Sequence, residues 1–599
     1  MSNTMRPSKL ISTFGPGSIM DLPDGASAMV LGTNFWHGHR KIFEPRLAKE
    51  LNVDYFGAPI ETYGSGWPLG IPYRDFPFYR VCPECNGLFP LTKLGKNLTC
   101  KKCGATPGAK EPPKTVSVRL VAACINGHIQ DFPWRWWIGC TCPKGKSDIH
   151  IEGGLTAGSG SDLRVLCKNK GCKSQPRDLR GALEYHSLKC GGERPWLGDK
   201  VGCDQDRIRG LLRGASNVYF PIIESSLSIP PFSNYLHVLI RDHIESARDA
   251  WNDGTIEEWI RITFRRLLND KNEKIEIKDL KRAFEEVYTG VSSSISIKGE
   301  EWQRFSHGGT SVYHPRDDFK MGTVDLSSSK LSGWFSGISR VTKLREVSAL
   351  HGFTRIEPFD GKEVTRIQKS NLDSAEWSRV LSDNEGLSPI PDVEGQTGKK
   401  WLPGAEMYGE GIFFEFDKGK ISAWERKTCV KKRHKEITAS PILPFARKGI
   451  DIILPRTIMI HTFAHHLIKE ISFACGYSMS ALRERIYSSE QENLSMYGVL
   501  IYTASPDSEG TLGGLVAQAK DSRTLENHIL SMLGSVGSCS QDPLCSAHDP
   551  AMTHSPWGAS CHACSQLPET SCEGLQNKIL DRFTILDHPT MGLEGYFDA

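Results

Sequence analysis

The sequence lacks the segments that direct proteins out of the cytoplasm or into a membrane. Its first residues, Met1 to Lys9, contain no apolar run of the kind that forms the core of a secretion signal. No stretch approaches the roughly 20 apolar residues that span a bilayer. These absences predict a cytoplasmic protein with no membrane partner.

A phosphate-binding loop is also missing. Gly15-Pro-Gly17 is a turn signal, but no Gly-Lys-Ser/Thr follows it, and the full motif of such a loop occurs nowhere else. We therefore expect no NTPase site in this chain. A strong charge of one sign is absent too, because 73 Lys and Arg residues oppose 70 Asp and Glu residues. Any nucleic-acid surface would therefore have to be a local patch.

What remains is the composition of an ordinary globular protein, with 39% hydrophobic and 24% charged residues. A length of 599 residues predicts about three to five domains. We expect a multidomain α+β protein. Its predicted segments are an N-terminal β-rich segment (1–77), a zinc-ribbon-like module (78–115), a second Cys-rich module (116–215), a helical insert (216–300), a mixed α/β segment with a linker (301–400) and a C-terminal α/β domain with a four-cysteine zinc cluster (401–599).

Cysteine is abundant and unevenly distributed. Sixteen of the eighteen cysteines lie between Cys82 and Cys203 or between Cys539 and Cys572. In a reducing compartment, clustered thiols are more often metal ligands than disulfides. Cys429 and Cys475 stand alone, and we interpret them as inert or packed thiols. The clustering predicts two to four structural zinc ions.

The first cluster has the most specific spacing. Cys82-x2-Cys85 and Cys100-x2-Cys103 are two tight turns that would direct four thiolates at one ion. Four thiolates complete tetrahedral zinc and leave no open position, which favours a structural site over a catalytic metal or a redox pair.

The next cysteines allow more than one interpretation. Looser spacing still predicts a second four-thiolate site, formed by Cys167, Cys172, Cys190 and Cys203. Cys124, His128, Cys140 and Cys142 could form a Cys3His site. The alternative is that Cys124 ends a buried strand while His128 bonds to nearby backbone.

Helical signals and basic runs occupy the middle of the chain. Thr255-Ile-Glu-Glu258 has the form of a capping box, and apolar residues from Ile256 to Leu268 keep helical spacing. A second amphipathic helix is predicted over 277–288, and Arg261, Arg265 and Arg266 are interpreted as a solvated face. The run from 426 to 435 favours a solvated loop, with phosphate binding as the alternative. Its DNA-binding candidates are Arg426, Lys427, Lys431, Lys432, Arg433 and Lys435.

The stretch from Leu454 to Cys572 combines histidines, a glycine turn and thiols. His461 and His465 are one helical turn apart, but Thr462 stands where a zincin protease needs glutamate. We therefore favour a structural helix packed on a strand over 498–503. The enzymatic alternative is a metal-assisted nuclease or hydrolase using His461, His465, Asp507 and Glu509. Zinc is predicted at Cys539, Cys545, Cys561 and Cys564, with Cys572 competing for one place.

An ordered set of motifs resembles the DrmB family of the DISARM anti-phage defence system. They are Arg6-Pro-Ser-Lys with Gly15-Pro-Gly17, Cys124-x-x-Gly-His128-x-x-Asp131-Phe-Pro-Trp134, Gly352-Phe-Thr-Arg-Ile356, His461-Thr-Phe-Ala-His465, Gly510-Thr-Leu-Gly-Gly514, Asp542-Pro-Leu-Cys545, Cys561-His-Ala-Cys564 and Glu569-Thr-Ser-Cys-Glu573. The resemblance implies a bacterial protein that acts with the helicase DrmA in a DNA-binding complex. The C-terminal part is similar to the domain that follows the motor in MrfA-type helicases, which carries a four-cysteine metal cluster. The resemblance supplies no catalytic residue.

Two hypotheses follow. The first is a non-catalytic zinc scaffold that binds a helicase partner and helps it engage DNA. The second is the nuclease or hydrolase described above. A further possibility is a pure assembly protein whose DNA contacts all come from the helicase.

Overall fold

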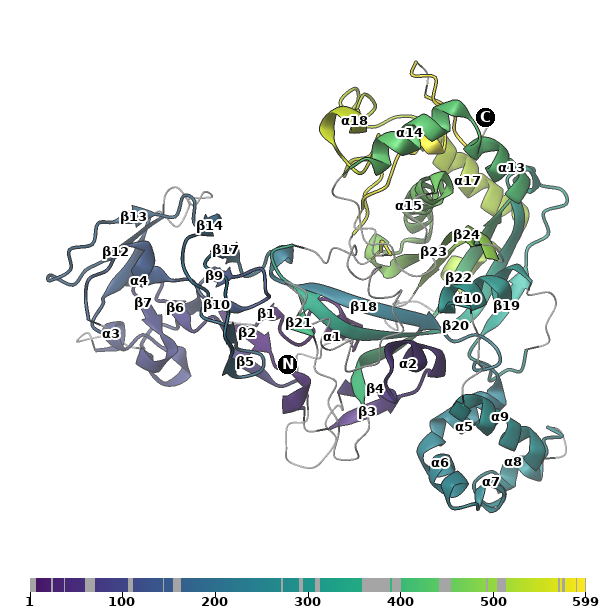
Figure 1. The fold of residues 1–599 in the computed structure, drawn as a ribbon, viewed down its shortest axis with the longest axis horizontal. Helices are drawn as coiled ribbons and strands as arrows, with labels where there is room; N and C mark the ends of the chain where they lie inside the picture. Colours follow the sequence, from purple (N-terminus) through teal and green to yellow (C-terminus); the bar gives the residue numbers. More distant parts are fainter. Residues whose placement is uncertain are drawn as a thin grey trace.

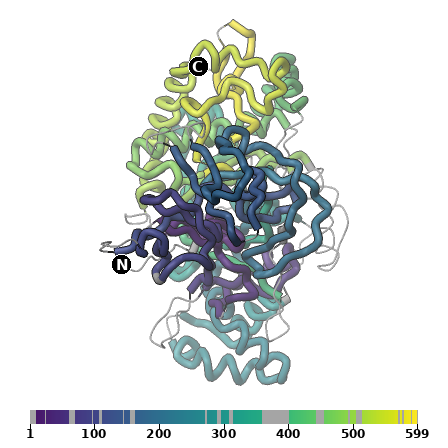
Figure 2. Tube along the Cα trace, turned by 90° about the vertical axis from the view of Figure 1, so that its left-hand side faces the viewer, coloured from purple at the N-terminus to yellow at the C-terminus, as the bar shows by residue number. Residues whose placement is uncertain are grey.

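The chain folds around one long, bent sheet, from which a Cys-rich arm and a helical insert project (Figure 1). This computed structural model describes residues 7–22, 25–36, 38–59, 70–105, 111–143, 145–153, 163–270, 273–289, 295–307, 313–357, 388–389, 400–440, 454–491, 494–503, 513–568, 571–573, 577–588 and 590–597. Figure 2 shows the C-terminal unit at the top and the helical insert at the bottom, with the arm between them and nearest the viewer.

Two long antiparallel strands form the middle of the sheet, β20 (Phe335–Thr354) and β22 (Trp401–Phe416). The order across the sheet is β18 (Phe220–Leu227), β20, β22, β24 (Leu494–Thr503) and β23 (Leu482–Gln491). Register shifts interrupt the β20–β22 ladder, one of them between Val341 and Leu344. Such bulges bend and twist a strand pair, so the two ends of these strands belong to different cores.

Alternation along β22 places neighbouring side chains in different layers. Ile412 and Phe414 are buried under α15 (Pro455–Cys475), whereas Phe413 stacks on Phe305 of α10 (Ile297–Ser306) across the sheet. The helix predicted from residue 454 is thus present. It packs on β24, which contains the strand predicted over 498–503.

The N-terminal segment covers the other end of the sheet. Its helices are α1 (Pro7–Ile11) and α2 (Pro45–Leu51), and its strands include β2 (Ser27–Val30), β3 (His39–Ile42) and β4 (Tyr55–Pro59). Strand β4 runs parallel to the start of β22, where Trp401 pairs with Tyr55. Met29 and Phe56 share a core with Phe353 of β20, so this segment is an integral part of the sheet's packing.

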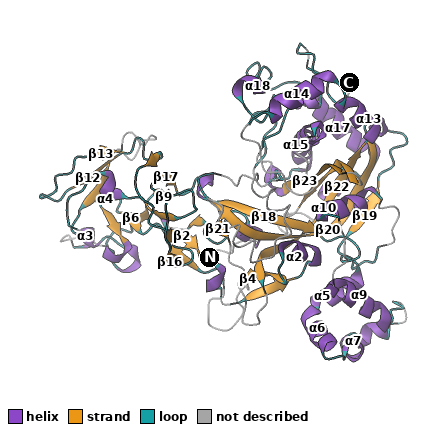
Figure 3. Ribbon diagram, in the orientation of Figure 1, coloured by secondary structure: helices purple, strands orange, loops and turns teal. Residues whose placement is uncertain are grey.

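The Cys-rich arm, residues 78–215, is built from short strands and turns (Figure 3). They include β6 (Tyr79–Val81), β7 (Leu88–Pro90), β9 (Leu120–Ala123), β10 (Ile129–Asp131), β11 (Ile149–Glu152), β12 (Arg164–Cys167) and β17 (Ile208–Leu212). The ring of Trp196 contacts that of Phe353 at 5.3 Å between centroids, which joins the arm to the central sheet.

The helical insert was predicted in type but not in every detail. Its helices are α5 (Tyr235–Asp242), α6 (Ile244–Asn252), α7 (Ile256–Thr263), α8 (Arg265–Leu268) and α9 (Ile277–Thr289). The predicted capping box is wrong, because Thr255 Oγ1 donates backward to the Ala250 carbonyl at 3.3 Å. The predicted continuous helix also breaks at Phe264, whose backbone leaves the helical region (φ −105°, ψ 22°).

The predicted fold class is confirmed. Strands and helices mix in several units, with a helical middle region and Cys clusters near both ends of the chain. The run from 426 to 435 was wrongly interpreted as a loop, because most of it forms α14 (Thr428–Thr438). Most of the linker predicted before residue 400 lies outside the described residues. None of the described helices is long and apolar enough to cross a membrane.

Candidate metal centres

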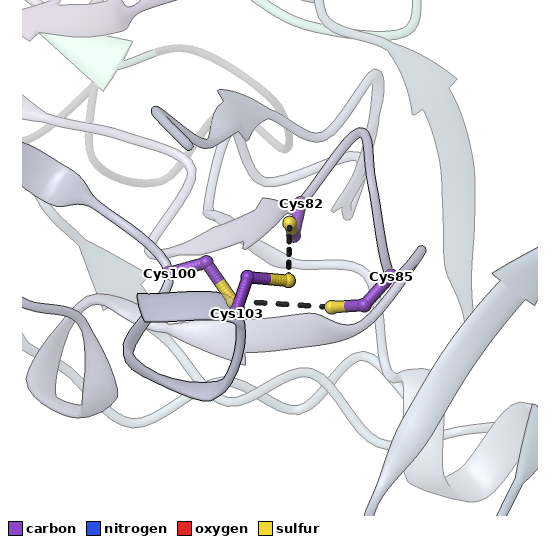
Figure 4. Close-up of side chains that lie close together, drawn as sticks. All are labelled: Cys82, Cys85, Cys100 and Cys103. Carbon is purple, nitrogen blue, oxygen red and sulfur yellow. Dashed lines mark hydrogen bonds between the residues drawn. The ribbon is translucent and has the colours of Figure 1, made fainter. Parts of the chain in front are cut away.

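The first cluster in the arm has the predicted members. Cys82 follows β6, and Cys85 lies in the next turn. Cys100 immediately precedes α3 (Lys101–Gly104), and Cys103 lies within it (Figure 4). The sulfur atoms of Cys82 and Cys103 are 3.8 Å apart, as are those of Cys85 and Cys100. Ligands on tetrahedral zinc at Zn–S distances of about 2.3 Å would be about 3.8 Å apart, so the donor set fits this ion.

The other two arm clusters exchange partners relative to the sequence prediction. The structure brings together Cys124, His128, Cys190 and Cys203 in one group, and Cys140, Cys142, Cys167 and Cys172 in another. The predicted pairing is wrong because strand pairing, rather than distance along the chain, sets the groups. Strand β17 pairs with β9, which carries Cys203 toward Cys124, and their sulfur atoms are 4.0 Å apart.

Strand pairing also brings the Cys140 group together. Strand β12 pairs with β11, so that Cys167 lies opposite Ile149. Cys167 Sγ is then 3.8 Å from Cys142 Sγ, and Cys172 Sγ is 3.6 Å from Cys140 Sγ. The sequence could not have distinguished the two groupings, because eight ligands form two interleaved sites as readily as two consecutive ones.

The C-terminal cluster also has the predicted members. Cys539 Sγ lies 3.5 Å from Cys561 Sγ, and Cys545 Sγ lies 3.7 Å from Cys564 Sγ. Backbone N–H groups of Gln541 and Cys561 donate to Cys539 and Cys564 sulfurs, a contact that favours thiolates over thiols. Cys572, the predicted competitor, lies elsewhere.

Cys572 instead joins His461, His465 and Glu484 in a fifth, internal cluster that the sequence prediction missed. Glu484, on β23, gave no signal in the sequence because a single acidic residue on a strand is common. Burial alone would lower the pKa of His461, but the charges of Glu484 and Cys572 raise it to about 10. His466 stays apart, and burial lowers its pKa to about 3.

The residues proposed for catalysis are only partly visible. Asp507 and Glu509 lie outside the described residues. His461 and His465 lie on α15 against β23 and are 0% exposed, so neither imidazole can reach a substrate in solvent. This geometry argues against a hydrolase built on these histidines.

The DNA-binding candidates separate into two groups. Arg433 is buried and donates to Asp581 at 2.7 Å, and Lys427 pairs with Glu594 at 2.6 Å. Four others are exposed on or next to α14: Arg426, Lys431, Lys432 and Lys435.

Comparison with known proteins supplies the family. DISARM protein DrmB of Bacillus paralicheniformis is 30% identical to this chain over 614 residues, which cover 93% of this chain and 96% of that protein. The chain belongs to the DrmB family. The motifs shared along the sequence had predicted this membership, which is confirmed.

Two matched domains place the clusters within this DrmB-family chain. Residues 6–220 match a domain of unknown function (DUF8724), which spans the N-terminal segment and the whole arm. Residues 463–565 match the MrfA Zn-binding domain, which contains all four cysteines of the C-terminal cluster. His461 and Cys572 of the internal cluster fall outside that match.

Proposed function

We propose that this DrmB-family chain is a non-catalytic, zinc-binding subunit of a DISARM-like anti-phage complex. It associates with a helicase partner and supports binding of foreign DNA. The observation that carries the proposal is the charge of the arm, which sets it apart from the rest of the chain.

The arm concentrates positive charge in a nearly neutral protein. Residues 78–215 contain 23 Lys and Arg against 12 Asp and Glu, while the whole chain has a net charge of +3. With zinc bound, the eleven thiolates and three dications of the arm's clusters would together carry a charge of −5, which offsets only part of this excess. A local basic surface on a rigid support is what sequence-independent contact with phosphates requires.

The best-defined basic patch surrounds the Cys140 cluster. Lys146, Lys170 and Lys173 are exposed on two loops that carry its ligands. These loops are tied together because Asn169 Nδ2 donates to the Lys146 carbonyl at 2.9 Å and the Lys173 N–H donates to Thr141 at 3.2 Å. A metal ion would hold the two loops that carry these lysines in a fixed arrangement.

Zinc in the four cysteine-rich clusters would be structural. Each cluster supplies four protein ligands, which leaves no vacancy for water or substrate. Because the sequence contains no phosphate-binding loop, ATP hydrolysis falls to the partner. The proposed partner is a DrmA-like helicase, as the family resemblance implies.

The C-terminal unit offers a surface for that partner. Leu544 and Met552 flank the C-terminal cluster and are 80% and 79% exposed, and Phe473 at the end of α15 is 92% exposed. Large apolar side chains left in solvent are candidates for contact with a partner chain.

DNA contact is tested with charge reversal in the purified chain and its helicase complex. The triple variant Lys146→Glu, Lys170→Glu, Lys173→Glu is expected to lower DNA affinity by about 10- to 100-fold at moderate salt, because three phosphate contacts are lost. It should also reduce the slope of log affinity against log salt by about 2 to 3. Fluorescence anisotropy over a salt series measures both quantities.

Two other triple variants change the net charge of the chain by the same amount as this one. Lys431→Glu, Lys432→Glu, Lys435→Glu tests the exposed face of α14, which we propose as a second DNA contact, and it is expected to weaken binding. Arg261→Glu, Arg265→Glu, Arg266→Glu on the helical insert is the control and should leave affinity unchanged. If all three variants bound DNA as tightly as the unmodified chain, the helicase alone would contact DNA, and if all three lost affinity equally, net charge alone would explain the loss. Either result would contradict the proposal.

A further inference from the structure

The internal cluster gathers four donor groups from three separate parts of the chain. His461 and His465 come from α15, Glu484 from β23, and Cys572 from the segment after the C-terminal cluster. His461 Nε2 is 3.2 Å from Glu484 Oε1 and 3.4 Å from Cys572 Sγ, and His465 Nε2 is 3.5 Å from Glu484 Oε1. The three polar residues are at most 1% exposed, and Cys572 is 8% exposed.

Backbone carbonyls orient both imidazoles. His461 Nδ1 lies 3.1 Å from the Ile579 carbonyl, and His465 Nδ1 lies 2.8 Å from the Ser565 carbonyl. A carbonyl can only accept, so each Nδ1 must carry the proton. In the neutral ring, each Nε2 then presents a lone pair to the centre of the cluster, which is the arrangement of metal-binding histidines.

The atoms that face the centre cannot satisfy one another. Two imidazole lone pairs, a carboxylate and a sulfur are all acceptors, and in a buried site such a set needs a cation or added protons. Among the described residues, His465 Nε2 and Glu484 Oε2 have no hydrogen-bond partner. The Asn577 N–H donates to Cys572 Sγ at 3.4 Å, which favours a thiolate there.

The geometry points to a fifth metal site, a closed structural site for a divalent transition-metal ion, with zinc favoured by the donor set. Ideal tetrahedral zinc places N, O and S ligands about 3.4 to 3.6 Å apart, close to the separations above. A carboxylate and a thiolate neutralise a dication, so the buried site would carry no net charge. The thiolate and imidazoles disfavour calcium and magnesium.

The ion would join the layers of the C-terminal unit. It would fasten α15 to β23 and to the chain end that follows the C-terminal cluster. It would also be linked to that cluster, since Ser565 accepts from His465 through its carbonyl while its hydroxyl donates to Cys564 Sγ at 3.3 Å. This inference is independent of whether the arm binds DNA.

The test is the number of metal ions per full-length chain, counted by native mass spectrometry and by elemental analysis. Glu484→Gln and Cys572→Ser are each expected to lose one metal ion relative to the unmodified chain and to lower the thermal midpoint. Cys475→Ser changes a lone thiol on α15, the helix that carries both histidines, and this variant should retain every ion. A buried ion pair of protonated histidine and Glu484 would instead lower the midpoint while leaving the metal count unchanged, which would overturn the proposal.

A second measurement needs no variant and covers the case in which the substituted chains do not fold. X-ray absorption at the zinc edge reports the average ligand set of the unmodified protein. With the fifth site filled, sulfur should supply about four of every five ligands. Nearly pure sulfur coordination, as the four cysteine-rich clusters alone would give, contradicts the proposal.

Discussion

Cys82→Ser is expected to unfold the first segment of the arm and to release one zinc ion. Residues 79–105 bury few apolar side chains, with Leu88 and Leu94 the main contributors. The fold there depends on the metal, whose binding free energy in small zinc modules is on the order of 10 kcal/mol. Loss of one ligand from four should remove most of that free energy.

The effect should remain local, because the central sheet has its own cores. Limited proteolysis is expected to cut the variant within 79–105 while the region from β18 onward stays intact. Native mass spectrometry should show one zinc fewer per chain. Cys429→Ser, at a thiol outside every cluster, serves as the control and should change stability by less than about 1 kcal/mol. A folded Cys82→Ser arm with unchanged zinc would contradict a structural metal.

Arg355→Met is expected to lower the free energy of unfolding by about 3 to 5 kcal/mol. The buried guanidinium donates to the carbonyls of Gly17, Gly127 and Val218 at 2.7, 2.9 and 2.6 Å. These carbonyls belong to the N-terminal segment, the loop between two metal-site residues and the entry to β18. Among the described residues no carboxylate pairs with Arg355, and burial lowers its pKa to about 9.

Methionine keeps much of the side-chain volume but leaves three carbonyls without a donor. Chemical denaturation followed by tryptophan fluorescence measures the change, since Trp196 lies 5.1 Å from the guanidinium. Arg119→Met, at an exposed position of the arm, should change stability by no more than about 0.5 kcal/mol. Equal stability of the two variants would show that Arg355 does not join these segments.

Spacing along the sequence predicted the two metal clusters whose ligands lie close together in the chain. The two Cys-x2-Cys pairs of the first cluster and the cysteines from 539 to 564 lie on adjacent turns, so their grouping follows from the chain itself. Helix α9 was predictable for the same reason, because its apolar residues repeat with the helical period.

Long-range strand pairing decided what could not be predicted. Cys124 meets Cys203 only because β9 pairs with β17, and no local pattern reports that register. Glu484 reaches the histidines because β23 packs under α15. The absence of glutamate at position 462 excluded a protease, yet it did not exclude a metal site with ligands from elsewhere. The basic run at 426–435 was misjudged because its charges outweighed Val430, which shares one buried helical face with Ile437 just beyond the run.

The central claim is that the metal-held basic arm contacts DNA within a helicase complex. Photo-cross-linking of double-stranded DNA to the assembled complex, with the cross-linked peptides identified by mass spectrometry, tests it most directly. Cross-links in this chain are predicted to concentrate between residues 78 and 215, above all on the loops that carry Lys146, Lys170 and Lys173. Cross-links confined to the helicase, or to the helical insert, would contradict the account.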